Sequence, residues 1–129
     1  SGGRPIAISH AGAQVATRTV FMPDYWKIRV SVYGPDGSRK TGDPVVQDVA
    51  GPLCFAGDMV ATGRALPLIE PGDYVALHDT GAYYYSNPFF YNALPAPAVY
   101  GAERNPDGSV TLDCWRRQQS MDDMLAVIG

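Results

Sequence analysis

One cysteine in this sequence stands in a setting that suits chemistry. Cys54 lies between a Gly51-Pro52 turn and a Gly57-Asp58 turn, so we predict that it sits on a loop. Loops carry many binding and catalytic groups, and a thiol whose surroundings favour the thiolate is a reactive nucleophile. A free cysteine also packs often as a small buried hydrophobe, so a buried Cys54 is the alternative interpretation.

A second chemical group is the phenol of Tyr83, at the end of the segment Asp79-Thr-Gly-Ala-Tyr83. A tyrosine hydroxyl can donate a hydrogen bond to a phosphate oxygen. Six aromatic residues fall between positions 83 and 91, so most of them must pack or form a surface patch. Such a patch predicts cover by a partner chain or by another domain.

Three segments together carry a resemblance to a known family: 51–58, 79–83 and the exit Tyr91-Asn92 followed by Pro95-Ala-Pro97. They resemble the C-terminal β-domain of the group IV (alanine-racemase-like, fold type III) amino-acid decarboxylases, which depend on pyridoxal 5′-phosphate. The resemblance is greatest to diaminopimelate decarboxylases, with ornithine and arginine decarboxylases as relatives. The resemblance covers roughly the whole of this chain, which by the usual domain sizes is about a third of a full enzyme.

The resemblance implies a role for each matching residue. Cys54 would be a catalytic residue that enters the active site of the neighbouring subunit in a homodimer. Tyr83 would bind the cofactor phosphate. Asp58 matches an acid of the motif and is predicted to help bind substrate across the interface, or else to close its own turn.

Phe55 departs from the family pattern. Similar decarboxylases for basic amino acids carry an acidic residue at this position, and that carboxylate pairs with the distal ammonium group of the substrate. Phe55 offers apolar area or a cation–π face instead. We therefore expect Phe55 to contact a modified, bulkier or carrier-linked amino-acid substrate, and the alternative is that Phe55 only packs.

The cofactor implied by the resemblance, pyridoxal 5′-phosphate, needs a lysine to hold it covalently. The chain contains only Lys27 and Lys40, and neither lies in a segment like the family's lysine motif. The resemblance places that lysine, and most cofactor contacts, on an N-terminal α/β barrel. We therefore predict that residues 1–129 are the C-terminal β-barrel domain of a larger enzyme, inactive when isolated.

The predicted function is that of the C-terminal domain of a decarboxylase, a carbon–carbon lyase. Two alternatives stay open: a catalytically silent relative that acts by binding another protein, and a racemase-like enzyme with the same cofactor. The Cys54 loop favours the decarboxylase, because the racemases of this fold resemble one another in having a tyrosine there instead.

Composition excludes several other classes. Hydrophobic residues make up 46% and charged residues 18%, which is typical of a folded domain. A net charge of -3 argues against nucleic acid as a partner. No apolar run approaches a membrane span and no signal-peptide pattern is visible, so we predict a cytoplasmic protein with two free thiols. His10 and His78 show no zinc-type spacing with the cysteines, so no metal is expected.

The elements that position these groups are predicted to be mostly strands. Alternation over 26–33 and apolar runs at 45–49 and 74–78 favour strands, and 98–103 with 109–114 favours a hairpin in which Cys114 faces the core.

Only one helix is predicted, beginning after the N-cap Ser120, with Met124 and Ile128 on its apolar face. The predicted fold is mainly β, an antiparallel Greek-key-like barrel with a short C-terminal helix.

Overall fold

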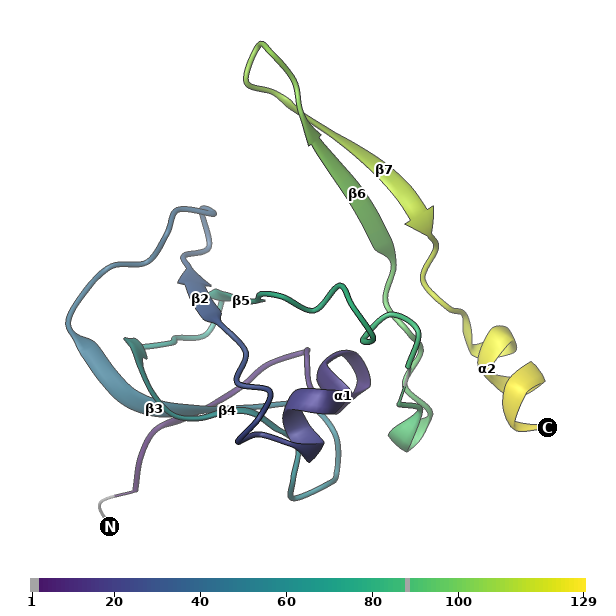
Figure 1. Cartoon of the computed structure of the whole chain (residues 1–129), viewed down its shortest axis with the longest axis horizontal. Coiled ribbons are helices and arrows are strands. Elements are labelled where there is room, and N and C mark those ends of the chain that lie inside the picture. The colour runs from purple at the N-terminus through teal and green to yellow at the C-terminus, as the bar shows by residue number, and fades with distance from the viewer. Residues whose placement is uncertain (1–2, 88) are drawn as a thin grey trace. The chain divides into compact units, whose positions relative to one another are not determined.

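The computed structural model of the chain describes residues 3–87 and 89–129 and contains two compact units. Unit 1 is Ser1–Asn92 and unit 2 is Ala93–Gly129, and each is described by itself. In chain order (Figure 1) the elements are β1 (Ile6–Ile8), α1 (Ala13–Phe21), β2 (Val30–Tyr33), β3 (Pro44–Ala50), β4 (Met59–Pro67), β5 (Tyr74–Leu77), the 3-10 helix η1 (Tyr91–Ala93), β6 (Val99–Arg104), β7 (Val110–Arg116) and α2 (Met121–Ile128).

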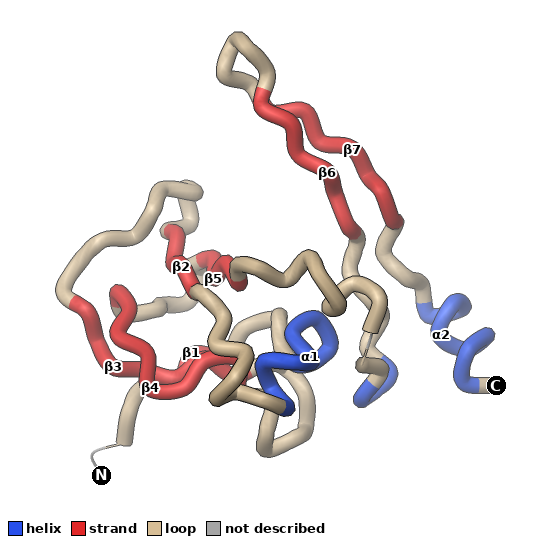
Figure 2. Tube along the Cα trace, viewed as in Figure 1, coloured by secondary structure: helices blue, strands red, loops and turns tan. Residues whose placement is uncertain are grey.

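The main sheet of unit 1 has the strand order β1-β3-β4 (Figure 2). β1 runs parallel to β3, whereas β4 is antiparallel to β3, and the register between β3 and β4 shifts on both sides of Val49. β4 also contacts α1, so this helix covers part of the sheet. The buried apolar residues of unit 1 are Ala13, Ala16, Val20, Ile28, Val32, Val49, Leu53, Val60, Ala61 and Leu66.

α1 is a helix that the sequence analysis missed. Its sequence AQVATRTVF is rich in β-branched residues, which have low helix propensity. Its N-cap, Gly12, provides no side-chain cap, and the Ala13 N–H instead bonds to the carboxylate of Asp58, 45 residues away in the sequence. The helix therefore depends on tertiary contacts that no local pattern contains.

The second sheet pairs β2 with β5 in antiparallel register, from Val30 opposite Leu77 to Tyr33 opposite Tyr74. The strand predicted over 26–33 is thus shorter than expected and begins at Val30. The cause is a turn before it, in which the Trp26 N–H bonds to the Met22 carbonyl. The strands predicted at 45–49 and 74–78 match β3 and β5.

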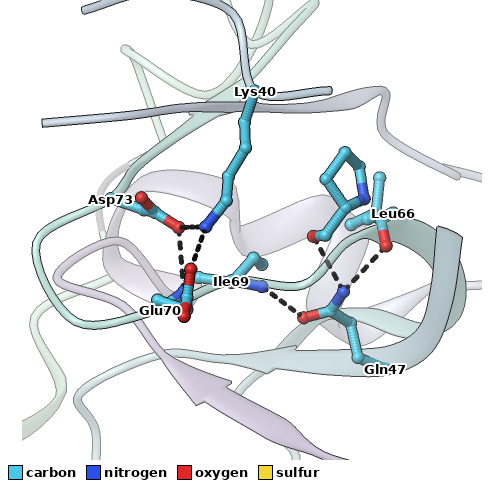
Figure 3. A network of polar contacts seen from close by, with 7 residues as sticks. Lys40, Gln47, Leu66, Ile69, Glu70 and Asp73 are labelled. Atoms are coloured by element: carbon cyan, nitrogen blue, oxygen red, sulfur yellow. Dashed lines mark hydrogen bonds and ion pairs between the residues drawn. The ribbon is translucent and has the colours of Figure 1, made fainter. Parts of the chain in front are cut away.

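A polar network fixes the turn between β4 and β5 (Figure 3). The buried amide of Gln47 donates to the Leu66 carbonyl at 3.1 Å and accepts from the Ile69 N–H at 3.1 Å. Lys40 Nζ pairs with Asp73 at 2.6 Å and with Glu70 at 2.7 Å. The hydrogen bond from Lys40 holds the pKa of the Asp73 carboxyl below its usual range. Both ends of the turn are therefore tied to neighbouring segments by satisfied polar groups.

Unit 2 is a hairpin followed by a helix, as the sequence predicts. β6 and β7 pair in antiparallel register, and Gly108 takes the positive φ of 86° that their turn requires. Cys114 is exposed, so its predicted core position is wrong: alternation defines two strand faces but does not determine which face is covered. Both cysteines are free thiols.

α2 begins with a complete capping box. The Ser120 side chain accepts from the Asp123 N–H, and the Asp123 carboxylate accepts from the Ser120 N–H. Arg117 pairs with the same carboxylate through two nitrogens. The predicted N-cap and helix are confirmed.

Acidification is expected to weaken the α2 cap. The hydrogen bond from Arg117, followed by the Ser120 N–H, lowers the pKa of Asp123 from its ordinary 3.8. A carboxyl whose folded pKa is lowered stabilises the folded state above its ordinary pKa and loses that contribution as pH falls below it. The helical NMR Cα shifts of residues 121–128 should therefore weaken progressively as pH falls below about 4, and the loss should be complete only below the lowered pKa of Asp123 in the folded state. Asp123→Asn should show this weakened state already at pH 7, whereas Asp122→Asn, outside the cap, should not.

The described residues are mainly β with two helices, and they form three separate sheets instead of one closed barrel. The strand pairs are antiparallel except for β1 and β3, which run parallel. Within residues 3–87 and 89–129, no helix has the length and apolar character needed to cross a bilayer.

Candidate functional site

Cys54 lies at the tip of the loop that joins β3 to β4, and its side chain is exposed. Gly51 and Asp58 close the base of this loop through the Gly51 N–H and the Asp58 carbonyl, at 2.8 Å. Inside it, the Phe55 N–H bonds to the Leu53 carbonyl at 2.8 Å. The predicted loop position is confirmed, and the alternative of a buried thiol does not apply.

Asp58 points away from solvent and binds backbone groups. Its Oδ1 accepts from the Ala13 N–H at 2.6 Å and its Oδ2 accepts from the Leu53 N–H at 2.8 Å. The side chain is buried, with 3% of the residue exposed. Two glycines, Gly12 and Gly51, leave the room that this carboxylate occupies, since a Cβ on either would overlap it. Asp58 thus joins the start of α1 to the loop that carries Cys54.

Phe55 is half-buried in an aromatic cluster formed by Phe21, Phe55, Phe89 and Tyr91. Its ring stacks on Phe21 with centroids 5.7 Å apart and an interplanar angle of 26°. The ring centroids of Phe55 and Tyr91 are 5.8 Å apart, and Phe89 stacks on Tyr91 with centroids 5.6 Å apart. These contacts account for an apolar residue at position 55 by packing, the alternative given in the sequence analysis.

Residues 91 and 92 hold the backbone of Cys54 from outside its loop. The Asn92 side-chain oxygen accepts from the Cys54 N–H at 3.0 Å, and its Nδ2 lies 3.7 Å from the Cys54 sulfur. The Tyr91 hydroxyl donates to the Cys54 carbonyl at 3.3 Å. From the sequence, this segment was expected to shape the loop and the subunit contact. The positive φ of Asn92, 60°, is a conformation that asparagine tolerates well, but sequence gives no indication of its contact with Cys54.

Tyr83 lies at a different place in unit 1, with 65% of the residue exposed. The Arg18 guanidinium carbon lies 4.5 Å from the centre of its ring and 4.4 Å from that of Trp26. A cation over two aromatic rings is held by attraction to their π faces. The neighbouring Tyr84 hydroxyl bonds to Thr19 Oγ1 at 2.8 Å. Arg18 was not identified from the sequence, because the helix that carries it was not predicted.

α1 contacts three of the residues that the sequence analysis singled out, Asp58, Phe55 and Tyr83. Its first residue, Ala13, binds Asp58, and its last, Phe21, stacks on Phe55. Between them, Arg18 holds the ring of Tyr83. The Cys54 loop and Tyr83 are therefore both positioned by one short helix.

Two grooves of unit 1 lie elsewhere. A groove of about 610 Å³ lies between β1 and the turn 69–75, and another of about 500 Å³ lies beside β4. Neither is lined by Cys54, Phe55, Asp58 or Tyr83. In the part of the chain that the structure describes, no three His, Cys, Asp or Glu side chains are placed to share a metal ion.

Comparisons with known proteins agree on one family. Residues 1–81 match the family described as "Pyridoxal-dependent decarboxylase, C-terminal sheet domain". A diaminopimelate decarboxylase of Escherichia coli (strain K12) is 35% identical over 98% of this chain, which covers 30% of that protein.

Solved structures give the same result. The crystal structure of a diaminopimelate decarboxylase superposes with a TM-score of 0.80 at 32% identity, covering 99% of this chain and 31% of the other. The crystal structure of a diaminopimelate decarboxylase from Helicobacter pylori complexed with L-lysine superposes with a TM-score of 0.79 at 23% identity, covering 99% of this chain and 29% of the other. This likeness shows the same fold. The chain thus spans under a third of the length of these relatives.

Proposed function

This chain belongs to the pyridoxal-dependent decarboxylases, as their C-terminal sheet domain, and on that premise we propose that the whole protein removes carbon dioxide from an amino acid. The observation that carries this proposal is an exposed Cys54 at a loop tip of the family's sheet domain. Residues 1–129 would act together with an N-terminal α/β-barrel domain. The share of the relatives that the chain covers, about 30%, leaves room for such a domain.

The side chains of this chain fit one part of pyridoxal 5′-phosphate. Tyr83 offers an exposed phenol beside the positive charge of Arg18, a donor and a cation suited to a phosphate group. Lys40 is engaged by Glu70 and Asp73, so it does not fit covalent attachment. We expect the attaching lysine on the N-terminal domain.

Cys54 would act on the proton that the reaction consumes. The cofactor, when bound, supplies the electron sink that makes loss of carbon dioxide feasible. The substrate carbon that loses carbon dioxide must then receive a proton, and Cys54 Sγ would hold that proton. Because Cys54 lies on an exposed loop of its own chain, we propose that it serves the active site of a second subunit in a homodimer.

Exposed aromatic residues support that assembly. Tyr83, Tyr85, Phe90 and Tyr91 are each between 38% and 65% exposed, and exposed apolar surface of this kind is often covered by a partner. Ile6 and Ile8 on the edge strand β1 are also exposed, at 59% and 79%. We propose that neighbouring domains cover these surfaces and that the three sheets belong to a Greek-key-like barrel in the assembled enzyme.

The substrate class follows from position 55. A phenylalanine there cannot pair with a distal ammonium group, so we propose a modified, bulkier or carrier-linked amino acid, with Phe55 as an apolar wall. Its contacts with Phe21 and Tyr91 would stiffen that wall. Asp58, buried against backbone groups, would support the loop that meets the substrate.

Carbon dioxide release tests the proposed function. The full-length protein with added pyridoxal 5′-phosphate would be assayed on a panel of free and modified amino acids, including diaminopimelate, ornithine and lysine. Release from a modified amino acid supports the proposal, while efficient release from the free dibasic ones contradicts the interpretation of Phe55. Racemisation without release would indicate the racemase-like alternative, and no turnover at all would favour a silent binding protein.

Tyr83 and Arg18 are expected to act on the cofactor phosphate. Tyr83→Phe should weaken binding of pyridoxal 5′-phosphate to the full-length apoprotein about tenfold, since a hydrogen bond to a charged group is worth about 1.5 kcal/mol. Arg18→Met should have a similar effect. Binding of pyridoxal, which lacks the phosphate, should not change in either variant. Tyr74→Phe, an exposed tyrosine on β5, is the matched control, and equal losses for both ligands would contradict the assignment.

A further inference from the structure

The side chain of Asn92 contacts Cys54 at two places. Its Oδ1 accepts from the Cys54 backbone N–H at 3.0 Å, and its Nδ2 lies 3.7 Å from Sγ. We propose that Asn92 is a positioning residue that orients the Cys54 thiol and supplies a hydrogen-bond donor to its sulfur. This inference rests on the proposed function, in which Cys54 serves the active site.

The backbone contact fixes which end of the amide faces the sulfur. An amide group has an acceptor oxygen and a donor nitrogen on the same carbon. Since the oxygen takes the Cys54 N–H, the NH₂ group is left to face Sγ. Aspartate could keep the first contact but not the second, and an aliphatic residue could make neither.

Two further features hold Asn92 and Cys54 in this relation. The Tyr91 hydroxyl bonds to the Cys54 carbonyl, so both backbone polar groups of Cys54 are tied to residues 91 and 92. The Tyr91 ring is itself fixed by stacking on Phe89 and by contact with Phe55. An exposed loop tip thus acquires a defined backbone position.

The chemical consequence concerns the charge on sulfur. A thiolate accepts a hydrogen bond far better than a thiol does, so a donor at Sγ favours the thiolate, which is the form that alkylating reagents attack and the form left once Cys54 has given its proton to the substrate carbon. A carboxylate in the same place would repel the thiolate. Asn92→Asp therefore replaces a group that favours the thiolate with one that disfavours it. The variant keeps the acceptor for the Cys54 N–H and a residue type that tolerates positive φ.

Thiol alkylation of the full-length protein tests the proposal. Iodoacetamide would be reacted at one pH, and the alkylated peptides containing Cys54 and Cys114 quantified separately by mass spectrometry. Asn92→Asp should slow alkylation of Cys54 about fivefold, the effect of one unit charge about 4 Å away in water. Cys114, exposed on β7, is the internal reference and should not change.

Tyr91→Phe is the matched control, because it removes the bond to the Cys54 carbonyl and leaves the amide in place. Its alkylation rate should stay within about twofold of the wild type, since an exposed neutral hydrogen bond contributes little. If Asn92 only tethers the loop, Asn92→Asp keeps that tether through its carboxylate oxygen, and Cys54 reacts at the wild-type rate. An unchanged or faster rate in Asn92→Asp, or an equal slowing in Tyr91→Phe, overturns the proposal.

Turnover separates this inference from the proposed function. In a full-length protein that releases carbon dioxide, Asn92→Asp should lower kcat and leave KM unchanged. Slower alkylation with an unchanged kcat would uphold the contact between Asn92 and Cys54 and contradict the catalytic use of Cys54.

Discussion

Gly51→Ala is expected to destabilise unit 1 by about 3 kcal/mol or more, at the upper end of overpacking substitutions. A Cβ at this position would overlap the Asp58 carboxylate and the backbone of Gly12. The carboxylate cannot swing aside, because both of its oxygens are bonded to backbone N–H groups. The backbone of Gly12 cannot retreat without moving the start of α1. The substitution should therefore disturb the Cys54 loop and α1 together.

Urea unfolding measures this effect. Trp26 lies in unit 1 and Trp115 in unit 2, so fluorescence in a Trp115→Phe background follows unit 1. Gly3→Ala is the control, because a Cβ there meets no atom within 4 Å. If the urea midpoint of Gly51→Ala equals that of the control, the loop can open around the added methyl group without loss of stability.

The features that were predicted correctly from the sequence are those determined by residues close together in the chain. The Cys54 loop follows from its flanking turns, and α2 follows from Ser120 with acids in the next turn. The hairpin of β6 and β7 follows from alternation on either side of a turn that contains Gly108. Each of these needs only contacts within a few residues.

The features that it missed depend on residues far apart in the chain. α1 is capped by a side chain 45 positions away, so its own composition gave no helix. The parallel pairing of β1 with β3 requires a connection through α1 and β2, which alternation cannot reveal. The contacts of Asn92 with Cys54 span 38 positions. Because α1 holds Tyr83 and Phe55 as well, missing it also concealed Arg18.

Asp58→Ala is expected to cost about 3 kcal/mol, since it leaves two buried N–H groups without acceptors at about 1–3 kcal/mol each. The groups are those of Ala13 and Leu53, and the carboxylate that binds them is 3% exposed. Asp58→Asn should cost less, because one amide oxygen still accepts while the NH₂ group faces the other donor. The same unfolding assay of unit 1 measures both variants.

A matched exposed carboxylate separates burial from loss of charge. Asp36 also accepts two hydrogen bonds, from the N–H and the hydroxyl of Ser38, but it does so on an exposed turn. Asp36→Ala should therefore shift the midpoint little, because solvent replaces both contacts. An equal shift for the two alanine variants would mean that Asp58 contributes no more than a surface turn residue.

The Asp58 variants also decide between the two roles considered for this residue. If Asp58 binds substrate, as the sequence analysis predicted, Asp58→Asn should raise KM of the full-length enzyme and leave unfolding unchanged. If it holds the loop, stability falls and kcat falls with it, because Cys54 is carried by the strand-to-strand loop that Asp58 closes. The buried position of the carboxylate and its two backbone donors favour the second result.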